Sequence, residues 1–298
     1  MPKNEDIYKE FNIFRKLLQT LTPGIGRSSE EVDKALDRYL RKLEKSALST
    51  LPPSKSYWQH HMFACANIAA SFGSYADDER KRNSVINIRM LEVLRLLIEY
   101  RILERTCSYY SICRQLRFML ESMLQAYYVD AEYGELDLQG KISVLKQMKR
   151  DGKAIGSKLL NMIDIDKRIK LRSMKKKVSV RARIENLYKD LSNTVHPDYS
   201  DFLPFLTESG DHFEWISRYM LVPNPKLSDY CSQKLNQVMD IIYLLIFDNF
   251  QVYALVPFKW IRDALSATNC FLTFDYLRSK ESASETKFKR NDVKRTSS

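Results

Sequence analysis

Glycine, proline and strand-like patterns are scarce in this sequence. Its 298 residues include eight glycines and nine prolines, and runs that alternate apolar and polar residues, as half-buried strands do, are few. The helix-favouring residues Leu, Lys, Arg, Glu and Met recur instead. Because 44% of the residues are hydrophobic, the chain can bury a core. The sequence therefore predicts an all-α protein, a multi-helix bundle with long central helices.

Cysteine and histidine are too few and too scattered for a metal site. The five cysteines include no C-x-x-C pair, and no cysteine lies at ligand spacing from any of the four histidines. The sequence also lacks a Gly-rich phosphate loop, a dinucleotide fingerprint, a nucleophile elbow and a metalloprotease motif. We therefore expect no metal and no cofactor, and small, buried, reduced thiols. The cysteines are Cys65, Cys107, Cys113, Cys231 and Cys270.

The sequence has no uninterrupted apolar run of membrane-spanning length. Its longest apolar stretch, residues 238–258, is broken by Asp240 and Asp248, and a charged residue at bilayer depth costs about 3 kcal/mol. This pattern predicts a buried core helix and no membrane partner. Residues 1–12 are polar and charged and lack the apolar segment of a signal peptide, so we expect a cytoplasmic protein.

Helix breakers and changes of composition predict three parts. Residues 1–75 are expected to form an N-terminal helical subdomain, and residues 76–278 the main helical bundle. Residues 279–298 contain almost nothing apolar and are expected to be a disordered basic tail. The helices expected in the first part are 6–21, 28–43 and 56–72.

The main bundle should contain one very long helix or two in tandem. Apolar residues recur at helical spacing through residues 83–131 with almost no breaker. A continuous helix of that length would span about 70 Å, more than a compact domain of this size needs. We therefore expect a bend near residues 105–111. The other helices expected in the bundle are 138–149, 154–162, 180–195, 228–254 and 258–277.

Positive charge is concentrated in residues 141–183, named the basic segment from here on. This segment contains fifteen Lys or Arg against three acids, a net charge of +12 in a chain whose total is +11. Residues 167–183 contain no acid at all. Such a concentration is typical of proteins that bind a polyanion, because Lys and Arg release the counterions condensed on a phosphate backbone. The alternative is a solvated helix face or loop that contacts nothing.

Nine residues of the basic segment form the predicted phosphate-contacting set. Contacts of this kind predict binding to RNA, DNA or a ribonucleoprotein, with a steep loss of affinity in salt and little sequence preference. The set consists of Lys167, Arg168, Lys170, Arg172, Lys175, Lys176, Lys177, Arg181 and Arg183.

His196 has the most polar surroundings of the four histidines. It follows the expected helix 180–195 and precedes Pro197, and Asn193 lies three residues before it. A helix C-terminus favours the imidazolium form, which can donate to a phosphate or act as a general acid if an Arg or a base is near. In the alternative interpretation, Asn193 and His196 bond the last helical carbonyls and a neighbouring helix.

These residues carry a resemblance to a known family. Residues 188–197, which end in His196 and Pro197, and the earlier helix 113–122, which carries Arg114 and Arg117, together resemble the helical-bundle family called HEPN. That family often pairs a helix bearing Arg and Glu with a late helix that ends in His. The resemblance covers roughly residues 83–197.

The resemblance implies a metal-independent ribonuclease that dimerises to bring two Arg and His motifs together. His196 would then lie at the site, with Asn193, Arg114 and Arg117 as helpers. The sequence departs from the family motif at one place, because the family has an Arg four to six positions before its His. Those positions hold Asp190, Leu191 and Ser192 here.

Three functions follow from the sequence. The leading hypothesis is a non-catalytic protein that binds nucleic acid or a ribonucleoprotein through the basic segment. The second is a HEPN-like ribonuclease or toxin that uses His196. The third is a helical protein–protein adaptor, whose long apolar helices hold a partner while the basic segment faces an acidic protein. A homodimer is also expected, because the apolar helices exceed what one small bundle requires.

Overall fold

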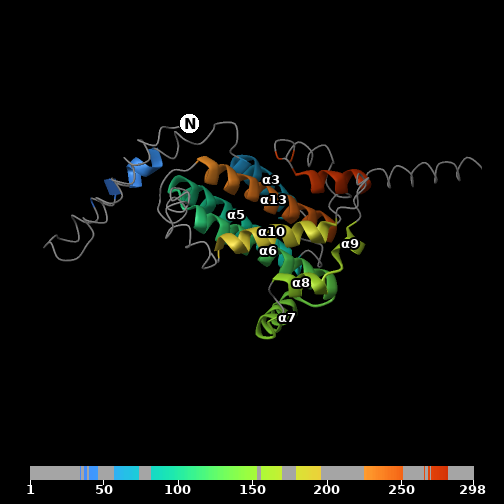
Figure 1. The fold of residues 1–298 in the computed structure, drawn as a ribbon. Helices are drawn as coiled ribbons and strands as arrows, with labels where there is room; N and C mark the ends of the chain where they lie inside the picture. The colour runs from blue at the N-terminus through green and yellow to red at the C-terminus, as the bar shows by residue number, and fades with distance from the viewer. Residues whose placement is uncertain are drawn as a thin grey trace, which may run out of the picture. The chain divides into compact units, whose positions relative to one another are not determined.

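The protein is described by a computed structural model whose regular elements are all helices. It describes residues 34, 37, 38, 40–45, 57–73, 82–152, 156–169, 179–195, 225–250, 265, 268 and 270–280. No strand occurs within these ranges, which confirms the predicted all-α multi-helix bundle (Figure 1). The helices are α3 (Tyr57–Gly73), α5 (Val85–Arg105), α6 (Tyr109–Glu132), α7 (Leu138–Arg150), α8 (Gly156–Met162), α9 (Ile165–Arg168), α10 (Val180–Val195) and α13 (Pro225–Phe250).

The chain divides into two compact units. The sequence prediction of a boundary at residue 75 stays a prediction, and the expected helix 6–21 lies outside the described residues. Residues 271–280 are helical, so the last helix extends two residues into the expected tail. The rest of that tail, residues 281–298, lies outside the described residues. The first unit comprises Met1–Ser56, Glu99–Ile112 and His196–Cys231, and the second Tyr57–Ile98, Cys113–Val195 and Ser232–Ser298.

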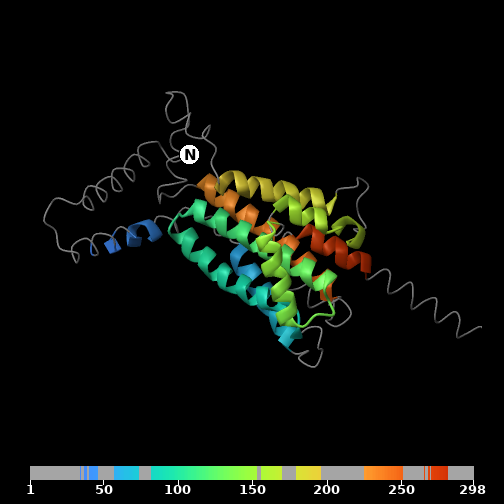
Figure 2. The same ribbon diagram turned by 90° about the horizontal axis from the view of Figure 1, so that it is seen from below.

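In the second unit, α10 lies alongside α6 and α13 in both ribbon views (Figure 1, Figure 2). Lys234 of α13 donates to Asp190 of α10 at 2.6 Å, and α10 also contacts α8 and α9. The apolar residues Ile184, Leu187 and Leu191 of α10 are all buried. Their three- and four-residue spacing places them on one helix face, as the sequence pattern predicted.

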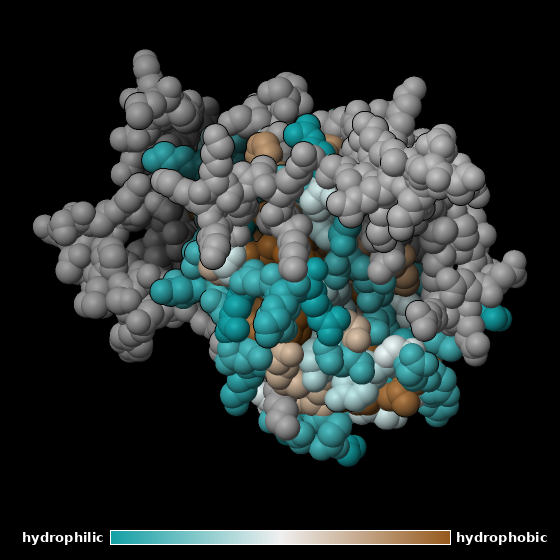
Figure 3. Space-filling view, turned by 90° about the vertical axis from the view of Figure 1, so that its right-hand side faces the viewer, coloured by the Kyte–Doolittle hydropathy of each residue, from teal (hydrophilic) through white to brown (hydrophobic). Residues whose placement is uncertain are grey.

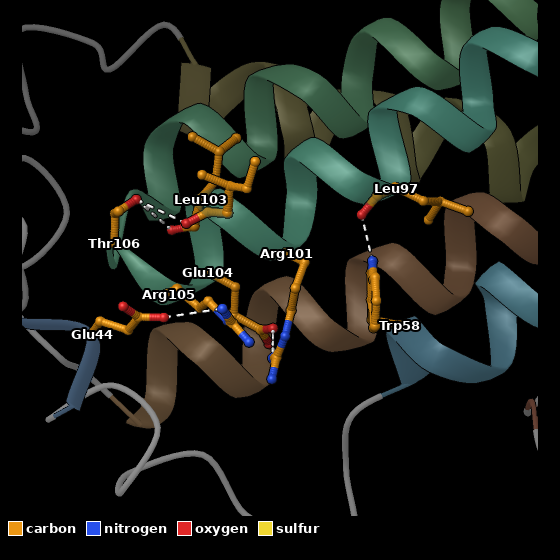
Figure 4. A network of polar contacts seen from close by, with 9 residues as sticks. Glu44, Trp58, Leu97, Arg101, Leu103, Glu104, Arg105 and Thr106 are labelled. Atoms are coloured by element: carbon orange, nitrogen blue, oxygen red, sulfur yellow. Dashed lines mark hydrogen bonds and ion pairs between the residues drawn. The ribbon is translucent and has the colours of Figure 1, made fainter. Parts of the chain in front are cut away.

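The predicted bend between the tandem helices lies at residues 106–108. Cys107 has a positive φ of 54°, and the amides of Ser108 and Cys107 donate to the carbonyls of Leu103 at 2.8 Å and Glu104 at 3.1 Å. These two bonds form the Schellman motif that ends many helices. The hydroxyl of Thr106 also donates to the Leu103 carbonyl, at 3.2 Å (Figure 4). The turn therefore satisfies the last carbonyls of α5 and lets α6 begin in a new direction.

A buried carboxylate determines where α5 begins. Asp130, near the end of α6, accepts hydrogen bonds from the amides of Val85 and Ile86, both at 3.0 Å, and from the hydroxyl of Ser84 at 2.5 Å. The first amides of a helix have no partner within the helix, so Asp130 supplies one from another helix. Lys141 of α7 completes the group with an ion pair to Asp130 at 3.1 Å.

The last helix begins differently from the expectation. The sequence predicted one helix over residues 258–277, but the chain is not helical at Cys270 and the described helix starts immediately after it. The cause is Asp240 of α13, whose buried carboxylate accepts from the amides of Leu272 and Thr273, both at 2.9 Å. The Thr273 hydroxyl adds a bond to Asp240 at 2.7 Å. A cap supplied from another helix therefore determines this start.

The helix α13 contains the buried core segment that the sequence predicted for residues 238–258, of which residues 251–258 lie outside the described residues. It begins at Pro225, a residue favoured at the first helical position because its missing N–H needs no partner there. Every residue from 238 to 247 is buried. Among the described residues, no helix combines the length and apolarity needed to cross a membrane. All five cysteines are buried and none forms a disulfide, and burial raises the pKa of Cys65 to about 12.

His61 is a satisfied core residue that joins α3 to α13. Its Nε2 lies 3.0 Å from the Asn236 Oδ1, and its Nδ1 lies 3.3 Å from the Tyr243 hydroxyl. A neutral ring protonated at Nε2 fits the shorter contact, because it donates to the amide oxygen. The Tyr243 hydroxyl in turn donates to the His61 carbonyl at 3.2 Å. Burial lowers the pKa of His61 to about 3. The imidazole is therefore neutral in the folded protein at neutral pH.

Because this buried imidazole is neutral, we predict that the free energy of unfolding depends on pH. The unfolded chain takes up a proton on His61 near pH 6.5, whereas the folded protein does so only near pH 3. The free energy of unfolding is therefore undiminished above pH 6.5 and falls with pH below it, by up to about 1.4 kcal/mol per pH unit from this group. Urea unfolding between pH 7 and pH 5 should show a shallower slope for His61→Gln. The variant His60→Gln, at an exposed neighbour, should keep the wild-type slope, and equal slopes for all three proteins would contradict the account.

Lys141 yields a second stability prediction. Its ammonium pairs with the buried Asp130 and donates to the Asn83 carbonyl at 2.9 Å. Replacement by the similarly sized Met leaves a buried carboxylate without its cation, which costs about 3 kcal/mol. Urea unfolding of Lys141→Met should show this loss, whereas Lys146→Met, at an exposed position on the same helix, should stay within about 0.5 kcal/mol of wild type. Equal stability of the two variants would mean that the pair does not hold the fold.

Candidate functional site

The basic segment occupies α7, α8, α9 and the beginning of α10 in the second unit. Nine of its fifteen Lys and Arg are described, and seven of these side chains are exposed. Arg181 is half-buried and Lys141 is buried. In Figure 3, hydrophilic residues line the lowest edge of the molecule, where Figure 1 places α7, and paler and hydrophobic residues lie just above them. The exposed cations, as they are called from here on, are Lys146, Lys149, Arg150, Lys158, Lys167, Arg168 and Arg183.

The first cation of the basic segment is not a surface group. Lys141 has a side chain only 3% exposed, and its ammonium contacts the Asp130 carboxylate of α6 and the Asn83 carbonyl just before α5. Lys141 is included in the net charge of +12 of the basic segment, but in the folded protein its charge is neutralised by Asp130. A helix that carries part of a basic segment can therefore contribute structural and surface cations from different faces.

The predicted phosphate-contacting set is described in part. Four of its nine members are described: Arg181 is half-buried and the other three are exposed. The described members are Lys167, Arg168, Arg181 and Arg183. The members that lie outside the described residues are Lys170, Arg172, Lys175, Lys176 and Lys177.

Several members of this set pair with acids. Lys167 lies 2.5 Å from Asp164, and this hydrogen bond lowers the pKa of that carboxyl from its ordinary value. Arg168 pairs with Glu132 of α6, and Arg181 lies 2.8 Å from Glu185 and also donates to Asn161. Ion pairs between exposed groups contribute little stability, about 0 to 1 kcal/mol. A phosphate can therefore replace these carboxylates at small cost.

The cations of α7 were not nominated from the sequence. Lys146, Lys149 and Arg150 are exposed, and none of them forms an ion pair with an acid in the described part of the chain. Helical spacing could have identified them, because the buried residues Lys141 and Met148 are seven residues apart and mark the inner face of α7. The three cations fall on the remaining faces. They also lie in the last turns of the helix, where positive charge is favourable.

The start of α10 carries cations where helices usually carry acids. Arg181 and Arg183 lie in its first turn, at the positive end of the helix dipole. Asp166 of α9 offsets this charge, because its carboxylate accepts from the Arg181 amide at 3.2 Å and from the Ser179 hydroxyl at 2.5 Å. Ser179 in turn accepts from the Ala182 amide at 3.0 Å. The dipole of α10, taken by itself, therefore disfavours arginines at these two positions.

Arg168 also lines a cavity of about 590 Å³ at the ends of α6 and α13. Its wall includes the Asp248 carboxylate, which accepts from the hydroxyls of Tyr127 at 2.6 Å and Tyr276 at 2.9 Å. Basic and acidic side chains are mixed in the lining, so the cavity has no single sign of charge to attract a polyanion. The charged lining residues are Asp130, Glu132, Glu135, Lys141, Arg168, Asp248 and Lys280.

The second candidate site lies where α6 meets α10. Arg117 donates to the Tyr188 hydroxyl at 2.7 Å, and that hydroxyl donates to Glu121 at 2.6 Å. The guanidinium also lies over the Tyr188 ring, 4.9 Å from its centroid, and 3.6 Å from Glu121. Burial, and then the bond to Glu121, raises the pKa of Tyr188, so the phenol keeps its proton. Arg117 therefore holds two helices together, and it also forms an i, i+4 ion pair with Glu121 of its own helix.

The directions of the helices can be read from their contacts. In α10 and α13, Asp190 pairs with Lys234. Burial raises the pKa of Asp240, and the positive charge of Arg183 opposes this rise, so Arg183 lies near Asp240 and the two helices are antiparallel. Both ribbon views show α6 running in the direction opposite to α10 (Figure 1, Figure 2).

This direction brings two of the predicted catalytic residues to the same end of the α6–α10 pair. Asn193 follows Tyr188 by five residues in α10, and Arg114 precedes Arg117 by three in α6. Because the helices are antiparallel and meet at Tyr188 and Arg117, both displacements lead toward one end. Both side chains are exposed. His196 lies outside the described residues.

Comparisons with protein-family models, with curated proteins and with solved structures gave no match to this chain. Among the described residues, no group of three or more His, Cys, Asp or Glu is arranged to hold a metal ion. The exposed cations and the α6–α10 contact are therefore the two candidate sites within the described residues.

Proposed function

We propose that this protein binds the phosphate backbone of nucleic acid through the exposed cations of its basic segment, without catalysing a reaction. The observation that carries the proposal is that seven of the nine described Lys and Arg of the segment reach solvent. Phosphate contacts by such side chains release condensed counterions, which supplies most of the affinity in sequence-independent binding. Nucleic acid here means RNA or DNA, alone or within a ribonucleoprotein.

The alternative of an inert solvated surface explains less of the arrangement. The placement of Arg181 and Arg183 at the positive end of α10 opposes helix stability. A nearby polyanion turns the same placement into an attraction. The exposed pairs of Lys167 and Arg168 with their acids are weak enough to open when a phosphate approaches.

The proposal predicts that binding depends on salt and on the cations of α7. Fluorescence anisotropy with labelled single- and double-stranded RNA and DNA should show an affinity that falls steeply as salt rises. For Lys146/Lys149/Arg150→Ala, each lost phosphate contact should reduce the slope of log affinity against log salt by about 0.7 to 0.9. The direction follows from the release of fewer counterions.

The control removes the same charge elsewhere. Arg41, Lys42 and Lys45 are exposed and lie outside the basic segment, so Arg41/Lys42/Lys45→Ala should retain the wild-type slope. Affinity that stays flat from low to moderate salt, or equal losses in the two triple variants, would count against the basic segment as the binding surface.

A second candidate function is the HEPN-like ribonuclease, and one observation favours it. The antiparallel arrangement of α6 and α10 directs Arg114 and Asn193 toward the same end of the pair, and His196 follows three residues after Asn193 in the sequence. A guanidinium and an imidazole near one phosphate would stabilise its developing charge and transfer a proton. Arg117 would act through its contact with Tyr188, by fixing the two helices.

The ribonuclease reading predicts RNA cleavage in the presence of a metal chelator. Arg114→Ala and His196→Ala should each lower the cleavage rate by about a hundredfold or more, because each removes a group that acts on the phosphate. Arg82→Ala, which removes an exposed cation elsewhere, should cleave as wild type does. Cleavage that persists in both site variants would remove these residues from the mechanism.

A further inference from the structure

The outward face of α5 is apolar. Four aliphatic side chains on this helix are largely exposed: Ile88 (45%), Leu91 (65%), Ile98 (52%) and Ile102 (57%). Single exposed apolar residues are normal on a protein surface, but a row of them marks an interaction site. The opposite face of α5 carries buried residues such as Leu97 and packs in the core, where Trp58 also donates to the Leu97 carbonyl (Figure 4).

The exposed residues of α5 follow a heptad pattern. They occur at positions 88, 91, 95, 98, 102 and 105, at alternating steps of three and four. This is the spacing of the a and d positions of a coiled coil, which form a continuous seam toward a second helix. The aliphatic residues fill four of these six positions, and Arg95 and Arg105 fill the others. An ordinary solvated helix has polar residues along this line.

We propose that this seam binds the α5 seam of a second copy of the chain, in an antiparallel pair about a two-fold axis. In a parallel pair, like positions meet, and Arg95 would face Arg95 of the other copy with like charges together. In an antiparallel pair whose axis passes between positions 96 and 97, Leu91 of one copy faces Ile102 of the other. Arg95 then faces Ile98, and each arginine meets an aliphatic residue.

The charges along the seam fit this arrangement. Arg95 can lay its aliphatic stem on Ile98 of the other copy and extend its guanidinium beyond it. The neighbouring position on that copy is Glu99, which lies beside the seam. The two-fold axis repeats this contact, so the pair gains two Arg–Glu contacts around an apolar centre. A surface that complements itself in this way fits a second copy, because a two-fold interface uses the same patch on both subunits.

The first test is the mass of the full chain in solution. Sedimentation equilibrium over a roughly hundredfold range of concentration should give twice the 35.0 kDa of one chain. Leu91→Glu/Ile98→Glu should be monomeric, with an unchanged helical circular dichroism spectrum because both positions are exposed. Phe63→Glu/Phe271→Glu, which alters apolar residues that are 63% and 72% exposed on other helices, should dimerise as wild type does. A monomeric wild type, or a dimer that survives Leu91→Glu/Ile98→Glu, would overturn the proposal.

The second test addresses the direction of the helices. A mixture of Arg95→Cys and Ile98→Cys chains should form a disulfide-linked heterodimer on mild oxidation, because these positions face each other in the antiparallel pair. Ile98→Cys alone should remain unlinked. Efficient linking of Ile98→Cys to itself would contradict the antiparallel arrangement. Reversal of charge gives an independent readout: Arg95→Glu should weaken the dimer, and Arg95→Glu/Glu99→Arg should restore it.

Discussion

Asp130 is the group on which the arrangement of the second unit depends most. Its carboxylate lies near the end of α6, accepts two amides at the start of α5, and pairs with Lys141 of α7. Three elements that are separate in the sequence thereby meet at one buried charge. A buried carboxylate is costly unless all its oxygens have partners, and here the costly group is fully bonded. Asp240 repeats the same device at the start of the last helix.

This constraint also explains how the basic segment is divided. Lys141 is drawn into the core by Asp130, and the cations that follow it on α7 face away from that contact. The segment thus has one cation that holds the fold and several that reach solvent. Of the cations near α9 and α10, the exposed Lys167 and Arg168 pair with Asp164 and Glu132, and the half-buried Arg181 pairs with Glu185. The attraction for a polyanion is therefore smaller than the net charge of the segment suggests, and it is greatest where no acid is paired, on α7.

Local patterns in the sequence predicted most of the described helices. The spacing of apolar residues predicted α10, α13 and the interruption between α5 and α6, because helix faces and breakers act over a few residues. It did not predict the start of the last helix, because the group that determines it, Asp240, lies about thirty residues earlier on α13. The burial of Lys141 was missed for the same reason, since its partner Asp130 belongs to another helix. The partners of Arg117 and Arg168 could not be predicted either, because Tyr188 and Glu132 also belong to other helices. His196 lies outside the described residues.

We propose that the exposed cations of the basic segment contact nucleic acid, whereas Lys141 does not. Lysine-modification footprinting by mass spectrometry, with and without single-stranded RNA, tests it residue by residue. The account predicts that Lys146, Lys149, Lys158 and Lys167 react in the unbound protein and are protected by RNA, and that Lys141 reacts in neither state. Unchanged reactivity of the four exposed lysines in the presence of RNA would contradict it, as would protection confined to Lys42 and Lys45.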